Sequence, residues 1–238
     1  MTIIKICGLT SAGDAVRVAG LGADIIGLVF APSRRRVDVQ QAVDIVRRIK
    51  QLPHRPALAG VFVNELPRVV NDIAAYCGLD MVQLSGDESW DYCSSLKTPF
   101  IKVIHITQNC TAAQVIGDVK AGYEAVRSRP FICMLDCKND DSYGGGGQSF
   151  DWDIAAGACA RYPLLLAGGL SPANVRRLIR RAGPAGVDVS SGVESAGSKD
   201  MEKVRDFIRA VRLTGGPGAK GRELLKTILF EGEKYVTR

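Results

Sequence analysis

Two stretches decide the fold: Leu164-Leu165-Leu166-Ala167-Gly168-Gly169-Leu170, and Val187-Asp188-Val189-Ser190-Ser191-Gly192-Val193-Glu194. Each is an apolar run that ends in small residues and then leads into a predicted helix. Small residues there leave backbone N–H groups bare at a helix N-terminus, where a phosphate can bind. Two such ends on the last two strands of a repeating strand–helix chain are typical of the phosphate site of a (β/α)8 barrel. The predicted phosphate-binding residues are Gly168, Gly169, Ser190, Ser191 and Gly192.

Apolar runs of strand length alternate with amphipathic stretches of helix length. Several runs are apolar throughout, as expected of parallel strands covered on both faces. Eight strands and eight helices predict an α/β fold, a single-domain (β/α)8 TIM barrel over residues 1–212. The predicted strands are Ile3–Cys7, Asp24–Phe30, Ala57–Val63, Leu79–Leu84, Pro99–His105, Phe131–Asp136, Pro163–Gly168 and Gly186–Ser190. The predicted helices are Ser11–Gly20, Val39–Gln51, Pro67–Tyr76, Ser89–Leu96, Ala112–Ala121, Asp151–Ala160, Pro172–Arg181 and Asp200–Arg212.

The alternative fold is a doubly wound open sheet. Such a sheet usually carries a glycine fingerprint after its first strand, but Cys7-Gly8-Leu9-Thr10 holds no G-x-G-x-x-G. Residues 213–238 form a glycine-rich linker and an amphipathic tail. Leu224, Leu225, Ile228 and Leu229 recur there at helical spacing, which predicts an extra C-terminal helix. This helix could pack under the barrel, meet a partner chain or extend into solvent.

Composition narrows the class of partner. The 238 residues carry a formal charge of +6 and a pI near 9.0, which favours anionic partners. The arginine clusters at 34–36 and 176–181 have no interleaved aromatic residues, so a nucleic-acid partner is disfavoured. No apolar run is long enough to span a bilayer. We expect a small phosphorylated substrate, no nucleic-acid or membrane partner, and a monomer or homodimer.

Cysteine and histidine usage also restricts the chemistry. The seven cysteines are odd in number and form no C-x-x-C, which favours reduced thiols in the cytoplasm. The N-terminus is too short for a signal peptide because Lys5 interrupts its apolar run. His54 and His105 are the only histidines, which disfavours a multi-histidine metal site and a Ser-His-Asp triad. We therefore expect neither metal nor cofactor.

The carboxyl ends of barrel strands carry the chemistry, and Cys7 and Asp136 stand out there. A thiolate can remove a carbon-bound proton if positive surroundings lower its pKa. A carboxylic acid can protonate an oxygen if burial raises its pKa. Together they suit isomerisation without a cofactor. The simpler alternatives are a small buried cysteine and an aspartate that caps a turn.

Other polar residues at the strand ends are candidates for substrate binding. Arg35 offers a guanidinium fork that could bind a carboxylate, although Ser33–Arg36 could equally be a solvated basic loop. Gln83 and Asp188 lie at the ends of the fourth and eighth predicted strands. The loop from Asp136 to Phe150 holds four consecutive glycines and is either a lid or slack chain.

The run Lys5-Ile6-Cys7-Gly8-Leu9-Thr10 resembles the opening signature of the phosphoribosylanthranilate isomerase family of tryptophan biosynthesis. Further motifs of that family follow in order over about residues 3 to 212, and together they are highly specific. They are Gly60-Val61-Phe62-Val63-Asn64, Val82-Gln83-Leu84, Leu135-Asp136 with the glycine run and Phe150-Asp151-Trp152, Leu166-Ala167-Gly168-Gly169-Leu170 with Pro172, Asn174 and Val175, and Asp188-Val189-Ser190-Ser191-Gly192-Val193-Glu194.

The resemblance implies a (β/α)8 barrel and an Amadori rearrangement. The substrate would be N-(5′-phosphoribosyl)anthranilate and the product 1-(2-carboxyphenylamino)-1-deoxyribulose 5-phosphate. By the same resemblance, Asp136 is the general acid that protonates the ribose ring oxygen. Cys7 is the general base that takes the proton from C2′ of the resulting Schiff base. Arg35 matches the arginine that holds the anthranilate carboxylate, and the phosphate would rest on the small residues named above.

Three positions depart from the family pattern. Ser85 stands where histidine is common, Gly146 replaces a hydroxyl residue of the lid, and Arg34 and Arg36 flank Arg35 so that the match could slip by one. None of these touches the acid or the base. The alternatives are a paralogous barrel isomerase for another aminosugar phosphate, a barrel isomerase or aldolase for another sugar phosphate, and a non-catalytic barrel that binds a phosphorylated ligand.

Overall fold

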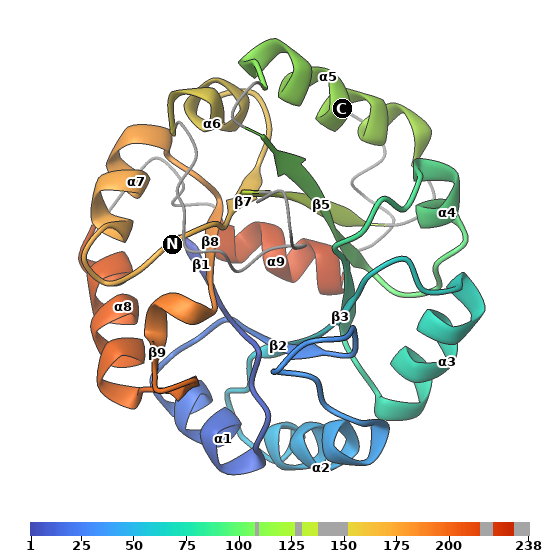
Figure 1. The fold of residues 1–238 in the computed structure, drawn as a ribbon, viewed down its shortest axis with the longest axis vertical. Helices are drawn as coiled ribbons and strands as arrows, with labels where there is room; N and C mark the ends of the chain where they lie inside the picture. The colour runs from blue at the N-terminus through green and yellow to red at the C-terminus, as the bar shows by residue number, and fades with distance from the viewer. Residues whose placement is uncertain (108–109, 127–129, 138–151, 215–220, 231–238) are drawn as a thin grey trace.

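The computed structural model describes residues 1–107, 110–126, 130–137, 152–214 and 221–230. Eight parallel strands, β1 to β8, close into a barrel in chain order, and helices surround it (Figure 1). This arrangement confirms the predicted (β/α)8 fold and excludes the open doubly wound sheet. The strands are β1 Ile3–Cys7, β2 Ile25–Val29, β3 Ala57–Phe62, β4 Met81–Leu84, β5 Phe100–Ile106, β6 Phe131–Cys137, β7 Leu164–Leu166 and β8 Gly186–Val189.

The helices cover the outside of the barrel, and side-chain caps fix several of their starts. Asp38 and Thr111 form capping boxes with Gln41 and Gln114, three residues further on in each case. The helices are α1 Ala12–Gly20, α2 Val39–Lys50, α3 Pro67–Cys77, α4 Trp90–Ser94, α5 Ala112–Ala125, α6 Trp152–Cys159, α7 Val175–Ala182 and α8 Met201–Leu213. The loop after β8 holds a short 3-10 turn, Ser191–Val193, and a two-stranded ribbon of β9 Glu194–Ser195 and β10 Ser198–Lys199.

Helix α7 begins three residues later than the sequence predicted. Pro172 was expected as its first residue, but the helix starts at Val175. The side chain of Asn174 bridges backward instead, because its Oδ1 accepts from the Ser171 N–H and its Nδ2 donates to the Gly169 carbonyl. These bonds hold residues 171–174 as a turn and tie the glycine pair after β7 to the start of the helix.

Alternation along each strand separates an inner from an outer core. Ile3, Met81, Ile132 and Met134 pack inside the barrel, whereas Ile4, Ile6 and Val82 pack between the strands and the helices. The inner face of β1 therefore carries Ile3, Lys5 and Cys7. By the same rule Gln83 and Asp136 point inward, because Met81 and Met134 precede them by two residues.

The predicted C-terminal helix is α9, Gly221–Phe230. In Figure 1 it lies across the barrel opening, and its Leu224, Leu225 and Ile228 pack against the inner core that includes Ile3 and Ile25. Arg222 Nε donates to Asp24 Oδ1 at 2.6 Å, which joins the helix to the segment just before β2. Of the three outcomes left open by the sequence, the helix takes the first and packs under the barrel.

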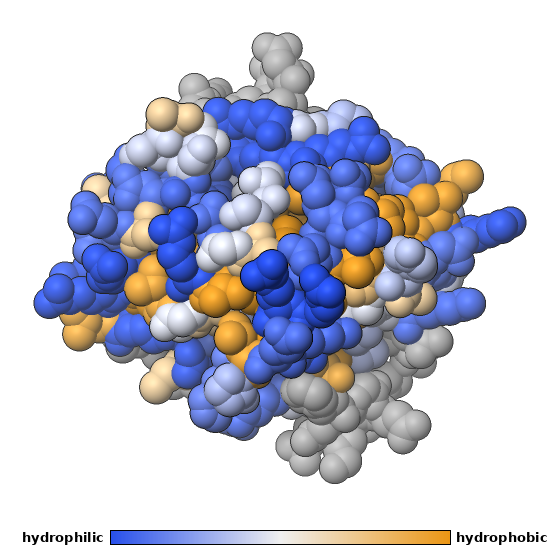
Figure 2. Space-filling view, turned by 90° about the horizontal axis from the view of Figure 1, so that it is seen from below, coloured by the Kyte–Doolittle hydropathy of each residue, from blue (hydrophilic) through white to orange (hydrophobic). Residues whose placement is uncertain are grey.

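The flank formed by α1 and α2 faces the reader in Figure 2. Hydrophilic side chains are interspersed there with smaller apolar patches, as is usual for amphipathic helices that cover a barrel. Within the described ranges, every helix is too short or too polar to cross a bilayer.

Candidate active site

The candidate residues gather at the carboxyl end of the barrel. Cys7 is the last residue of β1, and Asp136 is the last but one of β6. Alternation places both side chains on the inner face at the same end of the barrel, as the sequence predicted. Cys7 is buried, with 7 % of its surface exposed, and Asp136 is partly buried. A thiol and a carboxyl from two strands thus share one mouth.

Gly27 provides the space that Cys7 occupies. It is the register partner of Cys7 on β2. A Cβ at Gly27 would lie 2.7 Å from Cys7 Sγ and 3.1 Å from Lys5 Nζ, closer than real Cβ atoms approach without a shift of their neighbours. The absent side chain therefore leaves room for both the thiol and the ammonium group in the barrel.

Lys5 is fully buried beneath Cys7 and pairs with Asp188 from β8. The distance from Lys5 Nζ to Asp188 Oδ1 is 2.9 Å. Burial by itself lowers the pKa of Lys5, but the charges of Asp188 and Cys7 outweigh it and raise the pKa overall. Lys5 stays an ammonium, so the predicted substrate-binding Asp188 is engaged by a lysine. In the sequence, Lys5 stands out only as part of a motif.

Burial dominates the protonation of Cys7. It raises the pKa of the thiol, and Asp188 raises it further, while the positive charges of Lys5 and Lys199 lower it. The net effect is a raised pKa. The thiol therefore depends on nearby cations for any thiolate that it forms.

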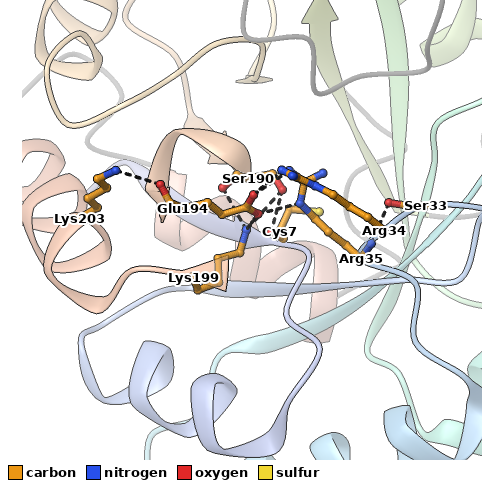
Figure 3. A network of polar contacts seen from close by, with 8 residues as sticks. All are labelled: Cys7, Ser33, Arg34, Arg35, Ser190, Glu194, Lys199 and Lys203. Atoms are coloured by element: carbon orange, nitrogen blue, oxygen red, sulfur yellow. Dashed lines mark hydrogen bonds and ion pairs between the residues drawn. The ribbon is translucent and has the colours of Figure 1, made fainter. Parts of the chain in front are cut away.

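Arg35 lies over the end of β1 and is held by Glu194. Gly8, at φ +80°, leaves the space through which the Arg35 chain passes, since a Cβ there would lie 2.4 Å from Arg35 Cδ. Arg35 donates from Nε to Glu194 Oε1 at 2.7 Å and from Nη2 to Oε2 at 2.9 Å (Figure 3). The Arg35 side chain is 15 % exposed and that of Arg34 is 60 % exposed. This difference favours Arg35 over Arg34 as the inward-facing arginine.

Glu194 gathers three cations at this edge of the mouth. Besides Arg35 it accepts from Arg34 Nη2 at 2.7 Å and from Lys199 Nζ at 2.6 Å (Figure 3). Burial opposes its charge, but hydrogen bonds from Arg35 and Lys199 outweigh this and lower the pKa of Glu194 to about 2. Glu194 is ionised at neutral pH and leaves a surplus of positive charge. Its role was not predicted, although it ends the last motif quoted above.

The predicted phosphate loops adjoin one another. Gly168 and Gly169 have φ of +89° and +64°, a left-handed conformation that glycine adopts readily. A Cβ at Gly192 would lie 1.8 Å from the Leu170 carbonyl oxygen, so the loops after β7 and β8 are pressed together. Ser190 Oγ donates to the Cys7 carbonyl at 3.1 Å and ties this region to β1. Gly168 and Gly169 donate their N–H groups to no acceptor in the described part of the chain, as a phosphate site needs.

Gln83 presents an unused acceptor to the barrel interior. Its Nε2 donates to Ser85 Oγ at 2.9 Å, so the serine that replaces the family's histidine orients this amide. Gln83 is buried, and its Oε1 has no hydrogen-bond partner among the described residues. A buried acceptor without a donor is costly, which marks Gln83 as a group suited to a ligand.

Two further predictions concern the lid and a metal site. The glycine run of the predicted lid, including Gly146, falls in 138–151, outside the described residues. Within the described ranges, no three His, Cys, Asp or Glu side chains gather as metal ligands would.

The fold and the mouth define a class: a (β/α)8-barrel enzyme whose candidate reactive groups lie at the carboxyl ends of the strands. Residues 4–210 match the sequence model of the family described as N-(5'-phosphoribosyl)anthranilate (PRA) isomerase. The chain belongs to this family of isomerases in tryptophan biosynthesis.

Individual relatives agree with the family match. The chain is 46 % identical over 212 residues to the N-(5'-phosphoribosyl)anthranilate isomerase of Dehalococcoides mccartyi, covering 89 % of this chain and 96 % of that protein. The corresponding protein of Pelobacter propionicus is 42 % identical, with 90 % and 97 % covered.

Solved structures give the same result. The phosphoribosyl anthranilate isomerase of Thermotoga maritima superposes with a TM-score of 0.75 at 34 % identity, covering 89 % of this chain and 99 % of that one. A phosphoribosyl anthranilate isomerase in complex with reduced 1-(o-carboxyphenylamino)-1-deoxyribulose 5-phosphate superposes with a TM-score of 0.72 at 34 % identity and the same coverage. The match to the family model covers the barrel and ends at residue 210, before α9 begins at Gly221.

Proposed function

We propose that this chain isomerises N-(5′-phosphoribosyl)anthranilate to 1-(2-carboxyphenylamino)-1-deoxyribulose 5-phosphate, with Asp136 as general acid and Cys7 as general base. Asp136 gives a proton to the ribose ring oxygen, and the C1′–O bond breaks to leave a protonated imine. The Cys7 thiolate then takes the proton from C2′, which yields an enolamine that tautomerises to the aminoketose. No redox partner or cofactor is consumed, because the hydrogen lost at C2′ is regained at C1′.

The placement of Cys7 and Asp136 on the inner face at one end of the barrel carries this proposal. The general acid and the general base must both reach the same small sugar. Cys7 on β1 and Asp136 on β6 meet this requirement because both point into the same closed ring of strands. The family to which the chain belongs supports the choice of substrate.

Binding groups at two sides of the mouth suit the two anionic ends of this substrate. The bare N–H groups of Gly168 and Gly169, beside Ser190, Ser191 and Gly192, would take the phosphate. Arg35 would take the anthranilate carboxylate. Glu194 occupies the Nε side of its guanidinium, while Nη1 bonds to no described residue and stays available. Gln83 Oε1 would accept a hydrogen bond from the substrate, and Asp188 would also contact the substrate.

The decisive experiment follows the fluorescence of freshly made phosphoribosylanthranilate as it is consumed. We expect Cys7→Ser and Asp136→Asn each to lower kcat by roughly 10²- to 10⁴-fold, because each removes a proton-transfer group but leaves the binding groups in place. Cys77→Ser is the matched control, since Cys77 is a buried cysteine at the end of α3, and it should keep normal turnover. Normal turnover in either site variant would refute the assigned role.

We also infer a cytoplasmic protein that is a monomer or homodimer. Cys7, Cys77, Cys93, Cys110, Cys133 and Cys159 are free thiols, as is usual in a reducing compartment. One relative, from Thermotoga maritima, is named as a dimeric enzyme with generated monomers. Light scattering on the purified protein would distinguish the two states.

A further inference from the structure

A charged pair lies inside a largely apolar barrel, and its place there needs a reason. Lys5 has no exposed surface and Asp188 is 8 % exposed. The neighbouring inner core consists of residues such as Ile3, Ile25 and Met134. Removing two charges from water costs more than an ion pair usually returns, so such a pair is weak evidence of a stabilising role. A buried titratable group with a specific charged partner beside a reactive side chain is a candidate for a functional role.

A second buried pair in this chain shows what a purely structural pair looks like. Lys102 Nζ lies 2.7 Å from Glu88 Oε2 and also donates to the Gly86 carbonyl. Glu88 in turn accepts from the N–H groups of Asn64 and Gly86, so this pair anchors the loops after β3 and β4. Among the described residues, Lys5 and Asp188 have no such set of backbone partners. Their side chains pair with each other, and the Lys5 ammonium lies below the thiol.

The geometry brings the Lys5 ammonium to the Cys7 thiol. Lys5 and Cys7 are two residues apart on the inner face of β1, so their side chains stack along the barrel axis. Their terminal atoms lie 3.1 Å and 2.7 Å from one point, the position of a Cβ on Gly27. Asp188 is the register partner of Lys5 on β8 and holds the ammonium from the other side.

We propose that Lys5 and Asp188 form a positioning pair for the general base: Lys5 stabilises the thiolate of Cys7 in the free enzyme, and Asp188 fixes the ammonium in place. This inference rests on the proposed role of Cys7 as the base. A buried thiol gives up its proton to solvent only if a cation compensates the new negative charge. Lys5 meets this need without touching the substrate, which distinguishes it from Cys7 and Asp136.

Each charged group of the described residues that acts on Cys7 must be included in the test. Lys5 comes from β1, Asp188 from β8, Lys199 from β10 and Arg35 from the loop after β2, while β2 itself contributes the uncharged Gly27. Lys5 and Lys199 favour the thiolate, and Asp188 opposes it. Arg35 and Lys199 are both held by Glu194 and keep their partners when Lys5 or Asp188 is changed.

The test measures the pH dependence of Cys7 alkylation by iodoacetamide in the free protein, with the modified peptide resolved by mass spectrometry. Lys5→Met should move the midpoint to higher pH, and Asp188→Asn should move it to lower pH. At a fixed pH below the midpoint, each pH unit by which the midpoint moves changes the alkylation rate tenfold. The double variant, which leaves no buried charge unpaired, should titrate between the two single variants. Opposite directions are the decisive result, because a general loosening of the barrel would move both single variants the same way.

Lys102→Met is the matched control, since it removes a buried, ion-paired lysine that does not adjoin Cys7 and should leave the Cys7 midpoint unchanged. If Lys5→Met does not fold, Asp188→Asn and the double variant still decide the question through the order of their midpoints. Equal midpoints in the wild type and the variants, or shifts in one direction only, would overturn the proposal. The alkylation assay uses no substrate, so failure here is separate from failure of Cys7→Ser to lose turnover.

Discussion

At the scale of single residues, the mouth of the barrel is organised by carboxylates that hold cations. Asp188 holds Lys5 under the thiol, and Glu194 holds Arg35 beside it. A guanidinium fixed on one side presents its other side in a defined direction, which lowers the entropy lost when a second carboxylate binds. If Arg35 binds the anthranilate carboxylate as proposed, the charge of Glu194 serves the binding of this like-charged group through the arginine between them.

Removal of either member of the Glu194–Arg35 pair should weaken substrate binding. We expect Arg35→Ala to raise KM about 10- to 100-fold, as loss of a charged hydrogen bond of about 1.5–3 kcal/mol implies. Glu194→Gln should raise KM less, because Arg35 is still present but no longer fixed, and kcat should change little in both. The measurement is steady-state kinetics with the fluorescent substrate.

Arg36→Ala is the control for this prediction, because Arg36 is an exposed neighbour on the same loop. Its KM should equal that of the wild type. An unchanged KM in Arg35→Ala together with a raised KM in Arg36→Ala would move the carboxylate contact to Arg36.

At the scale of elements, α9 is an addition to the family barrel. The family match ends at residue 210, and α9 begins at Gly221. Its apolar side, Leu224, Leu225 and Ile228, continues the inner core downward. A helix with so few residues is marginal in isolation, so its stability comes from this packing. Without this helix, the inner core would be exposed to water at this end of the barrel, which explains why the helix lies there.

Truncation of one α9 contact should destabilise the whole barrel. Ile228 is 2 % exposed, and Ile228→Ala should lower the free energy of unfolding by about 2–4 kcal/mol through lost burial and the cavity left behind. Leu213→Ala is the matched control, since Leu213 is 65 % exposed and should change stability by less than about 0.5 kcal/mol. Urea unfolding followed by circular dichroism measures both. Equal stability of the two variants would show that α9 does not contribute to the folded barrel.

At the scale of the whole molecule, closure of the barrel makes the site. β8 pairs with β1 in parallel, which places Ser190 against the Cys7 carbonyl and Asp188 against Lys5. The last loops thus meet the first strand, and the proposed phosphate region adjoins the thiol. A substrate with its phosphate on these loops would extend its sugar toward the proposed acid and base.

The contact between the last two loops should be needed for phosphate binding. Gly192→Ala places a methyl group where the Leu170 carbonyl lies, so the loops must separate, and we expect KM to rise at least tenfold with a smaller change in kcat. Inhibition by inorganic phosphate should weaken in parallel. Gly117→Ala is the control, because a Cβ there meets nothing within 4 Å and α5 should gain stability. Unchanged phosphate inhibition in Gly192→Ala would remove this loop from the phosphate site.

Much of the fold was predictable because it is encoded locally. The alternation of apolar runs and amphipathic stretches predicted every barrel strand to within a few residues, and parallel strands bring their carboxyl ends to one face. Cys7, Gln83 and Asp136 could thus be placed at one mouth from the sequence. The start of α7 was missed, since the side chain of Asn174 bonds to Ser171 and Gly169, and such bonds are not visible in a propensity pattern.

The order of the elements, the residues at the strand ends and, through the motifs, the family were thus all encoded locally in the chain. Which of those residues act on one another depends on the closed barrel. Lys5 and Asp188 are 183 residues apart, and Arg35 and Glu194 are 159 apart. The position of α9 under the barrel was likewise open in the sequence. The physical reason is that a periodic pattern specifies which side of an element is buried, whereas the partner across the core is specified only when the ring of strands closes.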